Sequence, residues 1–286
     1  MHTPLNILKT NLAAVVALLL LPTQATGQDR LSEDFMKAAR GADIVILGEV
    51  HDNPRHHEIQ AQAVKDLQPE ALVFEMIPEK HEAAVNRLRE EGASRAELAS
   101  ALNWEESGWP DFAYYAAILE ATPEARVVGG EQPIEQVRAA MTEGAAQVFG
   151  SEASTYGLDE PLGRQAQEAR EQRQYEAHCE AVPKEMLPGL VEAQRLRDAG
   201  LADAALRARA VTNGGQVVVI TGNRHANLHS GIPEALRFAA PDLELVTLGQ
   251  LEAEPEPDAP PPYDFHHVSA PPDRPDPCAE FRESVD

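Results

Sequence analysis

The sequence predicts an α/β fold: a mainly parallel sheet flanked by helices, with a helical cap insertion and an irregular C-terminal tail. Short runs of β-branched and aliphatic residues recur without polar alternation, which indicates strands buried on both faces of a parallel sheet. The segments between these runs are rich in Ala, Glu, Arg and Leu with helical spacing. Strands that alternate with helices form layered sheets with right-handed crossovers.

The first residues are expected to be a signal peptide, residues 1–27. Lys9 precedes an apolar run over residues 12–21, and Pro22 and small residues follow it, which is the order of a secretory signal. The apolar run is shorter than the roughly 20 residues that span a bilayer, and no cysteine lies there to carry a lipid anchor. We therefore expect a periplasmic or secreted protein, without membrane insertion after cleavage.

Residues 28–250 are expected to form the α/β domain. Five apolar runs predict its strands, and they begin at Asp43, Ala71, Ala125, Gln216 and Leu243. The segment after the first run has Pro54 in position for a first helical turn, with Ile59, Ala63 and Leu67 on one face. The order strand, helix, strand is therefore established early in the chain.

Two regions depart from this rhythm. Residues 159–210 contain no strand signal and are expected to be a helical cap insertion, whereas residues 251–286 are proline-rich and acidic and cannot build a core. Cys179 and Cys278 are the two cysteines of the chain, one in each region. In an oxidising compartment they are expected to form a disulfide, and two free thiols are the alternative.

The charge of the chain excludes some partners. Its 47 Asp and Glu against 24 Lys and Arg give a net charge of −23. An acidic surface repels phosphate backbones and anionic lipid headgroups, so nucleic acid is not an expected partner.

Polar side chains follow four of the predicted strands. They are Glu49 and His51, then Glu75, then Glu131, then Asn223, Arg224 and His225. Because ligands bind beyond the carboxyl ends of parallel strands, we expect these groups to converge on one site. A buried acid there must be paired, protonated or bound to a metal.

Four of these residues form a mixed nitrogen and oxygen donor set: Glu49, His51, Glu75 and His225. The set suits a divalent transition metal, or a general acid/base site around a bound water. A metal-dependent hydrolase of amide or ester bonds would use these four residues. In the alternative interpretation, the two glutamates cap helices and pair with Arg224.

Nearby residues are expected to be structural. His56 lies on the apolar face of its helix and is predicted to be a hydrogen-bonded core histidine, whereas His57 is compatible with a solvated surface. The aromatic residues between 104 and 115 are typical of core. The sequence has no HExxH, CxxCH, Walker A, GxSxG or strand-linked GxGxxG motif, so helix-type metallopeptidases, c-type cytochromes, nucleotidases and serine hydrolases are disfavoured.

The strand-end residues belong to longer motifs: "LGEVHDNPRHHEIQ", "FEM", "WEESGWPDFAYY", "MLPGLVEAQRLRDAGLA" and "ITGNRHANLHSGIPEAL". With these motifs, and with Gly-x-x-His elements at 48–51 and 222–225, the sequence resembles the ChaN-like haem-binding uptake proteins of the Tiki/TraB/erythromycin-esterase superfamily. The resemblance covers nearly all of residues 41–248. It implies a parallel core with a helical cap, haem as ligand, and a homodimer that holds it.

The resemblance implies an exported haem-binding protein that acts in haem or iron uptake or handling, and it leaves the iron ligand open. Haem iron accepts His, Tyr or Met. The candidates in the cap are His178, Tyr175, Tyr156 and Met186. The candidates for the haem propionates are Arg224, Arg197 and Arg195. The alternatives are the metal-dependent hydrolase and a binding module that has kept only the fold.

Overall fold

The sheet of the computed structural model has six parallel strands in the order β3-β2-β4-β1-β5-β6. The structure describes residues 31–276, 278 and 279, so the expected signal peptide, residues 1–27, lies outside the described residues. The strands are β1 Ile44–Glu49, β2 Ala71–Pro78, β3 Arg126–Glu131, β4 Val217–Gly222, β5 Leu245–Leu251 and β6 Phe265–Val268. The predicted parallel α/β fold is confirmed.

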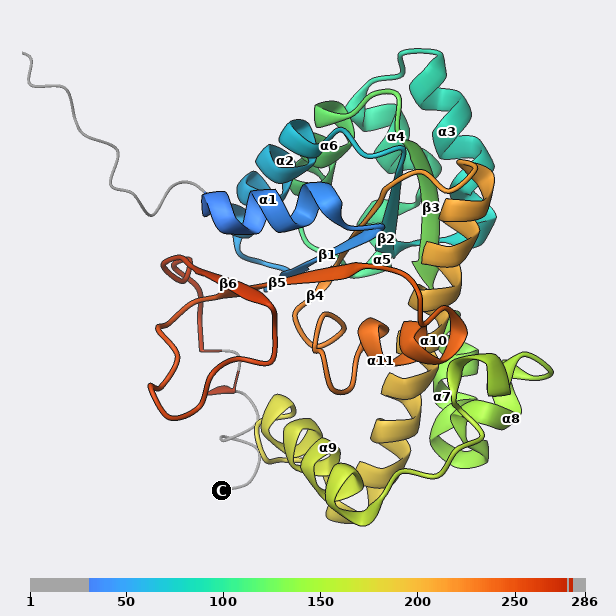
Figure 1. Cartoon of the computed structure of the whole chain (residues 1–286), viewed down its shortest axis with the longest axis vertical. Helices are drawn as coiled ribbons and strands as arrows, with labels where there is room; N and C mark the ends of the chain where they lie inside the picture. The colour runs from blue at the N-terminus through green and yellow to red at the C-terminus, as the bar shows by residue number, and fades with distance from the viewer. Residues whose placement is uncertain (1–30, 277, 280–286) are drawn as a thin grey trace, which may run out of the picture.

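Helices cover both faces of the sheet (Figure 1). One face carries α1 Glu33–Gly41, α2 Pro54–Leu67, α3 Glu82–Glu90, α4 Arg95–Ala101, α5 Trp104–Ser107 and α6 Phe112–Ala121. The other carries α7 Ile134–Glu143, α8 Ala145–Phe149, α10 Leu187–Val211 and α11 Ile232–Ala239. Short 3₁₀ turns are η2 Glu79–His81, η3 Ala153–Tyr156 and η4 Lys184–Met186.

The continuous apolar strands explain why both faces are covered. In β1, Val45 and Leu47 belong to the hydrophobic cluster on one side, while Ile44 and Ile46 belong to the cluster on the other. All four side chains are fully buried. Successive side chains of a strand point to opposite faces, so an apolar run without alternation needs helices on both.

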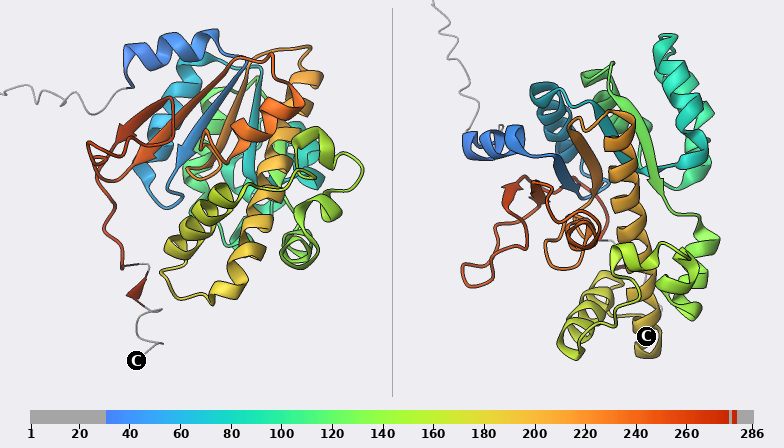
Figure 2. Two further views of the ribbon diagram at one scale, coloured as in Figure 1. Left: turned by 60° about the horizontal axis from the view of Figure 1, so that its bottom comes forward. Right: turned by 45° about the vertical axis from the view of Figure 1, so that its right-hand side comes forward.

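The cap lies beyond the carboxyl ends of the strands. Helix α9 Arg164–Ala177 packs against α10, and the two form a hairpin at the end of the sheet to which the strand arrows point (Figures 1 and 2). The second half of α10 returns along the sheet, where Leu201, Ala204 and Ala208 are buried. Helix α10 therefore joins the cap rigidly to the core.

The C-terminal tail is more ordered than its composition predicts. Residues 265–268 form β6 beside β5, because Asp264 accepts hydrogen bonds from the backbone N–H and the hydroxyl of Thr247. Further along, Arg274 forms ion pairs with Asp52 at 2.9 Å and Glu252 at 2.5 Å. The proline-rich composition of the tail did not predict this sixth strand.

The described part of the tail reaches the cap. Cys278 forms a disulfide with Cys179 just after α9, with 5.4 Å between the Cα atoms. The predicted disulfide is confirmed. The tail thereby acts as a strap, residues 252–276 with 278 and 279, that links the sheet edge to the end of α9.

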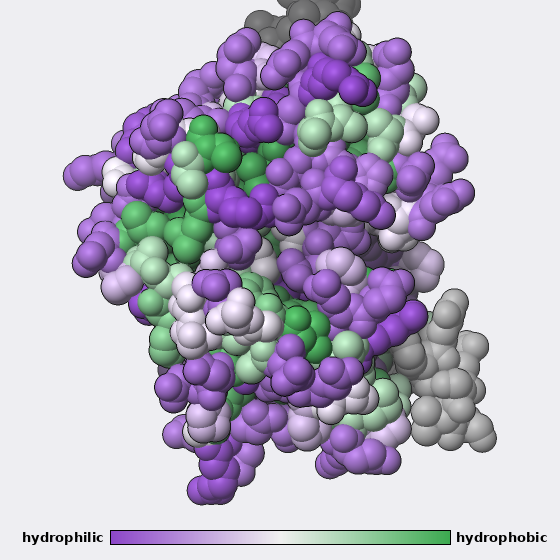
Figure 3. Space-filling view, turned by 90° about the vertical axis from the view of Figure 1, so that its right-hand side faces the viewer, coloured by the Kyte–Doolittle hydropathy of each residue, from purple (hydrophilic) through white to green (hydrophobic). Residues whose placement is uncertain are grey.

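One face of the molecule is largely hydrophilic (Figure 3). Figure 3 shows this face, on which hydrophobic side chains form small groups between hydrophilic ones. Within the described residues, no helix combines the length and apolar character needed to cross a membrane.

Candidate functional site

Strand ends bring the predicted site residues together. Glu49 is the last residue of β1, and β4 ends three residues before His225. Strand β2 pairs with β4 only as far as Phe74, so Glu75 lies where the two strands separate. The predicted convergence is visible at Gly222: an added Cβ there would lie 2.8 Å from Nε2 of His51 and 3.6 Å from Oε2 of Glu75.

The first half of the site is built around Glu49. Oε1 of this buried carboxylate lies 2.8 Å from Nδ1 of His51 and accepts a hydrogen bond of 2.9 Å from the Tyr115 hydroxyl. Oε2 lies 3.5 Å from Nδ1 of His57. A carboxylate on Nδ1 fixes the ring and leaves Nε2 of His51 as the open nitrogen.

The second half is built around His225, which is 6% exposed. Its Nε2 lies 3.2 Å from Oε1 of Glu75, and its Nδ1 lies 2.6 Å from Oδ1 of Asp198 on α10. Oε2 of Glu75 accepts hydrogen bonds of 2.7 Å from the Thr221 hydroxyl and the Gly222 N–H. Both ring nitrogens of His225 are therefore occupied by carboxylates.

These contacts set the charges. Burial acts to lower the pKa of His225, but the charges of Glu75 and Asp198 outweigh it and raise the pKa to about 9. Burial also opposes ionisation of Glu75, yet the charge and hydrogen bond of His225 hold its pKa well below the usual range. For Asp198, burial prevails and raises the pKa. At neutral pH His225 is thus an imidazolium between acidic groups.

His51 differs from His225 because one side of it is open. Burial acts to lower its pKa, but the hydrogen bond to Glu49 and the charge of Glu75 raise it. The side chain retains 33% exposure, and its ring meets the edge of Trp109 at a centroid distance of 5.0 Å. An oriented imidazole with a free nitrogen can exchange a proton with a ligand or bind a metal ion.

Two histidines on α2 support this half-site. His56 is fully buried and its Nδ1 accepts a hydrogen bond of 2.9 Å from the Val50 N–H, so the predicted core role is confirmed. Burial lowers its pKa to about 4. His57 is 1% exposed and stacks on Tyr114 at 5.0 Å, so the solvated-surface interpretation is wrong. Helix α2 instead turns His57 inward beside Glu49.

The other predicted strand-end residues, Asn223, Glu131 and Arg224, make no hydrogen bond or ion pair with these histidines in the described chain. The Asn223 side chain donates to the Gln250 carbonyl and accepts from the Gln250 N–H, which joins the ends of β4 and β5. Glu131 is half-buried at the end of β3, and burial raises its pKa. The pairing of Glu49 and Glu75 with Arg224 is not observed, because both carboxylates are bound to histidines.

The four residues proposed as metal ligands are not arranged as one metal-binding group. Across residues 31–276 and 278–279, no group of three or more His, Cys, Asp or Glu side chains is arranged to hold a metal ion. Glu49 and His51 form one pair, and Glu75 and His225 form another. A divalent metal at these residues stays a prediction.

The four haem-ligand candidates lie in two places. His178 follows α9, is half-buried, and holds its Nδ1 2.7 Å from the Gln174 carbonyl, so its Nε2 is not engaged in that bond. Tyr175 is half-buried one turn earlier, with the Lys184 ammonium 5.6 Å from its ring centre. Met186 is 43% exposed in the turn before α10. These three candidates share the tip of the cap.

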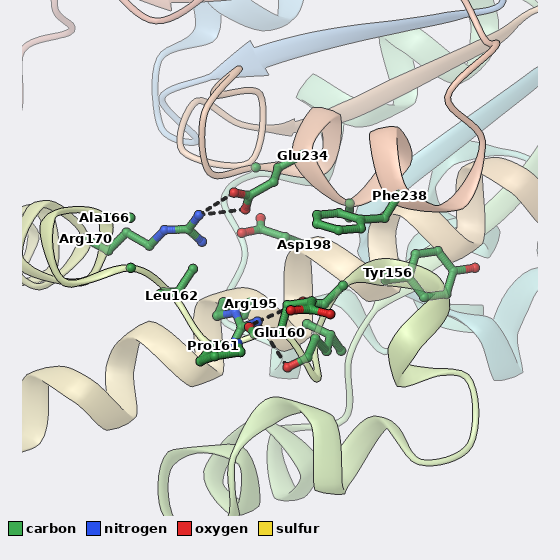
Figure 4. A pocket seen from close by; sticks show the side chains of 15 residues that line it. Tyr156, Glu160, Pro161, Leu162, Ala166, Arg170, Arg195, Asp198, Glu234 and Phe238 are labelled. Atoms are coloured by element: carbon green, nitrogen blue, oxygen red, sulfur yellow. Dashed lines mark hydrogen bonds and ion pairs between the residues drawn. The ribbon is translucent and has the colours of Figure 1, made fainter.

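Tyr156 lies elsewhere. It is 6% exposed and donates a hydrogen bond of 2.8 Å to Asp203, and it lines a cavity of about 240 Å³ between η3 and α11. Figure 4 shows this cavity, with Asp198 between Glu234 and Phe238. Oδ2 of Asp198 is buried there without a hydrogen-bond partner in the described residues.

The arginine candidates also differ. Arg195 pairs with Glu192 at 2.9 Å and donates to the carbonyl groups of Gly157 and Leu158, so it is a structural residue. Arg224 and Arg197 have no hydrogen bond or ion pair within the described part of the chain. They remain available to an anionic ligand.

Two site residues were missed by sequence reasoning. Asp198 lies within a long helix with no motif of its own, and Tyr115 lies among aromatic residues that resemble core. For Asp198, one usable signal is an acid on an otherwise alanine-rich buried helix face, because such a group needs a partner.

A known protein family matches most of the chain. The family model for "haem-binding uptake, Tiki superfamily, ChaN" matches residues 35–236. No curated protein matches the chain.

Among solved structures, one that reports cofacial haem binding to ChaN of Campylobacter jejuni is 20% identical with a TM-score of 0.60, and the match covers 78% of this chain and 87% of that chain. The type III effector HopBA1 is 11% identical with a TM-score of 0.42, covering 76% and 81%. An erythromycin esterase, EreC, in its open conformation is 13% identical with a TM-score of 0.38, covering 81% and 77%.

The first of these structures shares the fold, and the other two are too distant to support an argument. The family match spans more than half of the 286 residues and includes both halves of the strand-end site as well as the cap. This protein belongs to the ChaN family of haem-binding uptake proteins in the Tiki superfamily.

Proposed function

We propose that this protein binds haem on its cap and acts in haem or iron uptake. The observation that carries the proposal is the family match over residues 35–236, which includes α9 and the first turns of α10. The side chains at the cap tip fit haem by their chemistry, since imidazole, phenol and thioether groups all ligate haem iron. Haem would supply an iron centre and a flat apolar ring with two carboxylates.

His178 is the proposed iron ligand, with Tyr175 as the second choice. The bond from Nδ1 of His178 to a backbone carbonyl fixes the ring, and an imidazole held in this way presents Nε2 to a metal. Met186 is a third candidate on the same tip. Tyr156 does not fit, because binding iron would break its hydrogen bond to Asp203 in a buried position.

We further propose that a second copy of the chain covers the haem. The cavity beside the cap, which α9 and α10 line together with Arg224, Pro262 and Tyr263, measures about 240 Å³. Pockets that enclose drug-sized ligands measure about 300–1,000 Å³. A porphyrin would therefore remain largely uncovered on one chain, and the solved structure of Campylobacter jejuni ChaN describes cofacial haem.

Hemin titration of the purified protein tests haem binding. We expect a shifted Soret band that saturates near one hemin per chain, and a haem-dependent increase in mass by light scattering. His178→Ala should weaken binding about ten-fold or more. His81→Ala is the matched control, because His81 also holds its Nδ1 2.8 Å from a backbone carbonyl, far along the chain from the cap. A spectrum equal to that of free hemin would refute the proposal.

We also propose that the chain is exported. The signal-like order of residues 1–27 and the confirmed disulfide between Cys179 and Cys278 support this proposal, because stable disulfides form in oxidising compartments. Mass spectrometry of protein recovered from the periplasm or medium should find an N-terminus near residue 28. Recovery of the uncleaved chain in the cytoplasm alone would contradict it.

A hydrolase is the second candidate, favoured by the His51–Glu49 pair. Glu49 orients His51, whose Nε2 is open, and the pair lies beside the His225 imidazolium. A water held by Nε2 of His51 could lose its proton to the ring and attack an amide or ester carbonyl. With a divalent metal at Glu49, His51, Glu75 and His225, the metal would lower the pKa of that water.

A panel of chromogenic esters and amides, with and without added Zn²⁺ or Mn²⁺, tests this alternative. Activity should fall about 100-fold or more in His51→Ala, in the range expected for loss of a general base. The exposed His229→Ala serves as the control. Equal activity of the two variants would reject the hydrolase.

A further inference from the structure

The cavity between α9, α10 and the loop from β4 to α11 has an unusual lining for so acidic a protein. Its lining residues are Arg170, Arg173, Gln174, Val191, Gln194, Arg224, Asn227, Ser230, Pro262 and Tyr263. Among these described residues, three are arginines and none carries a carboxylate. Yet the chain contains about twice as many acids as bases. The cavity lining is therefore more basic than the chain as a whole.

Two of the arginines are unpaired. Arg170 is neutralised by Glu234, which accepts two hydrogen bonds of 2.7 Å from one of its nitrogens. Arg173 and Arg224 have no hydrogen bond or ion pair with any described residue, and they come from α9 and from the β4–α11 loop respectively. The charges of Asp198 and other carboxylates act on both guanidinium groups but form no ion pair with either of them. Both groups can therefore still bind an anion in the cavity.

Neutral donors complete the lining. The amide of Gln174 and the hydroxyl of Ser230 belong to residues that are 7% and 8% exposed, and neither group has a hydrogen-bond partner within the described chain. The Asn227 side chain, also 8% exposed, uses only its carbonyl oxygen, on the His229 N–H. These polar atoms are not fully enclosed by the described chain. They are therefore open to the cavity and can donate hydrogen bonds to the oxygen acceptors of a ligand.

The rest of the cavity is apolar. Val191 is 1% exposed on α10, and the strap contributes Pro262 and the ring of Tyr263, whose pKa is raised to about 12 by burial. Strap and loop are tied together here, because the Leu228 N–H donates to the Pro262 carbonyl at 2.9 Å. The ligand therefore has an apolar body next to its anionic group.

We propose that this cavity binds the carboxylate of an amphipathic ligand, with Arg173 and Arg224 as the charge partners. The choice of ligand rests on the proposed function: if the cap binds haem, the cavity receives a haem propionate. The shared chemistry is a carboxylate on an apolar body, and a separate organic acid has the same chemistry. Arginine suits this role because its planar fork matches two carboxylate oxygens.

The test compares hemin with haem dimethyl ester, which has the same iron and ring but no carboxylates, on the disulfide-intact protein. Wild type should bind hemin about ten-fold or more tightly than the ester. Arg173→Gln/Arg224→Gln should weaken hemin binding to the level of the ester and leave ester binding unchanged. Arg138→Gln, an exposed arginine without a partner in the described chain, is the matched control.

Calorimetry with octanoate at low salt forms the second arm. Octanoate binding that is lost in the double variant, together with unchanged hemin binding, would assign the cavity to a separate organic acid. If hemin fails to bind but octanoate binds, the carboxylate site stands and the haem function fails. If hemin binds equally to wild type and the double variant and octanoate does not bind, the carboxylate site is overturned while the haem function stands.

Discussion

The Nδ1 atom of His225 lies 2.6 Å from Oδ1 of Asp198, although the first residue follows β4 and the second lies in the middle of α10. This contact fastens the cap helix to the strand-end site. On its other side the same ring lies 3.2 Å from Glu75, which continues the connection into β2. A single buried imidazolium thus joins cap, loop and sheet.

Removing either member of this contact should destabilise the fold. Asp198→Asn and His225→Gln each leave buried charge without its partner, which costs about 3–5 kcal/mol in the free energy of unfolding. Urea unfolding at pH 7 measures the loss. In the double variant the losses should fall short of the sum, and additivity within about 0.5 kcal/mol would show that the two residues are not coupled.

The charge of His225 also predicts a pH dependence of stability. Its pKa in the folded state is about 9, above the ordinary value of 6.5. A raised pKa means that the folded state binds the proton more tightly, so the stabilisation is complete below pH 6.5 and is lost as pH rises through 9. Unfolding free energies at pH 6, 7.5 and 9 should fall more steeply in wild type than in His225→Gln, where the raised pKa of His51 still contributes. The exposed His229→Gln should follow wild type, and a parallel fall in His225→Gln would contradict the assignment.

The position of the His51 ring should depend on the absence of a side chain at Gly222. An alanine Cβ would lie 2.8 Å from Nε2 of His51, so the ring must move away, at a cost of about 1–3 kcal/mol. The NMR signals of the His51 ring and their titration should change in Gly222→Ala. Gly41→Ala is the control, since a Cβ there meets nothing within 4 Å. Unmoved His51 signals would show that the ring has room.

Tyr115 should stabilise the carboxylate of Glu49. Tyr115→Phe removes a buried hydroxyl that donates to this carboxylate at 2.9 Å, and loss of a hydrogen bond to a charged group costs about 1.5–3 kcal/mol. Tyr114→Phe provides the comparison, because Tyr114 stacks on His57 and its hydroxyl has no hydrogen bond in the described chain. Denaturant unfolding of both variants checks the difference. Equal losses would assign the role of Tyr115 to its ring alone.

The strap should depend on its disulfide. Reduction, or Cys278→Ser, is expected to cost about 2–4 kcal/mol and to lower the thermal midpoint. Wild type with and without reductant gives the measurement, and Cys278→Ser should be insensitive to reductant. Because the strap lines the cavity with Pro262 and Tyr263, hemin affinity should fall in parallel. A midpoint that does not respond to reductant would show that β6 and Arg274 hold the tail alone.

The sequence was sufficient to predict five of the six strands and the convergence of their carboxyl ends. Continuous apolar runs such as that of β1 identify strands buried on both faces, and parallel strands bring their carboxyl ends to one edge. Glu49, His51, Glu75 and His225 could therefore be placed together from the order of the chain alone. Which carboxylate would bind which imidazole could not be predicted, because the pairing depends on where β2 separates from β4.

The rest of the site depends on tertiary contacts with no local signal. Asp198 contacts His225 because α10 packs on the sheet in a position that places Asp198 beside the end of β4. In the chain the two residues are 27 positions apart. His57 turns inward because Tyr114 and Tyr115 of α6 pack on its ring. Strand β6 forms from a proline-rich segment because β5 offers a free edge. Each of these outcomes reflects packing that overrides local composition.

The bond between Cys179 and Cys278 closes a covalent ring whose cysteines are 99 residues apart and which includes β4, β5 and β6. A protease that cuts the backbone once inside this ring produces two polypeptides that cannot diffuse apart. After a nick between Cys179 and β4, three strands would stay attached to the other three, and only chemical reduction would release the fragment.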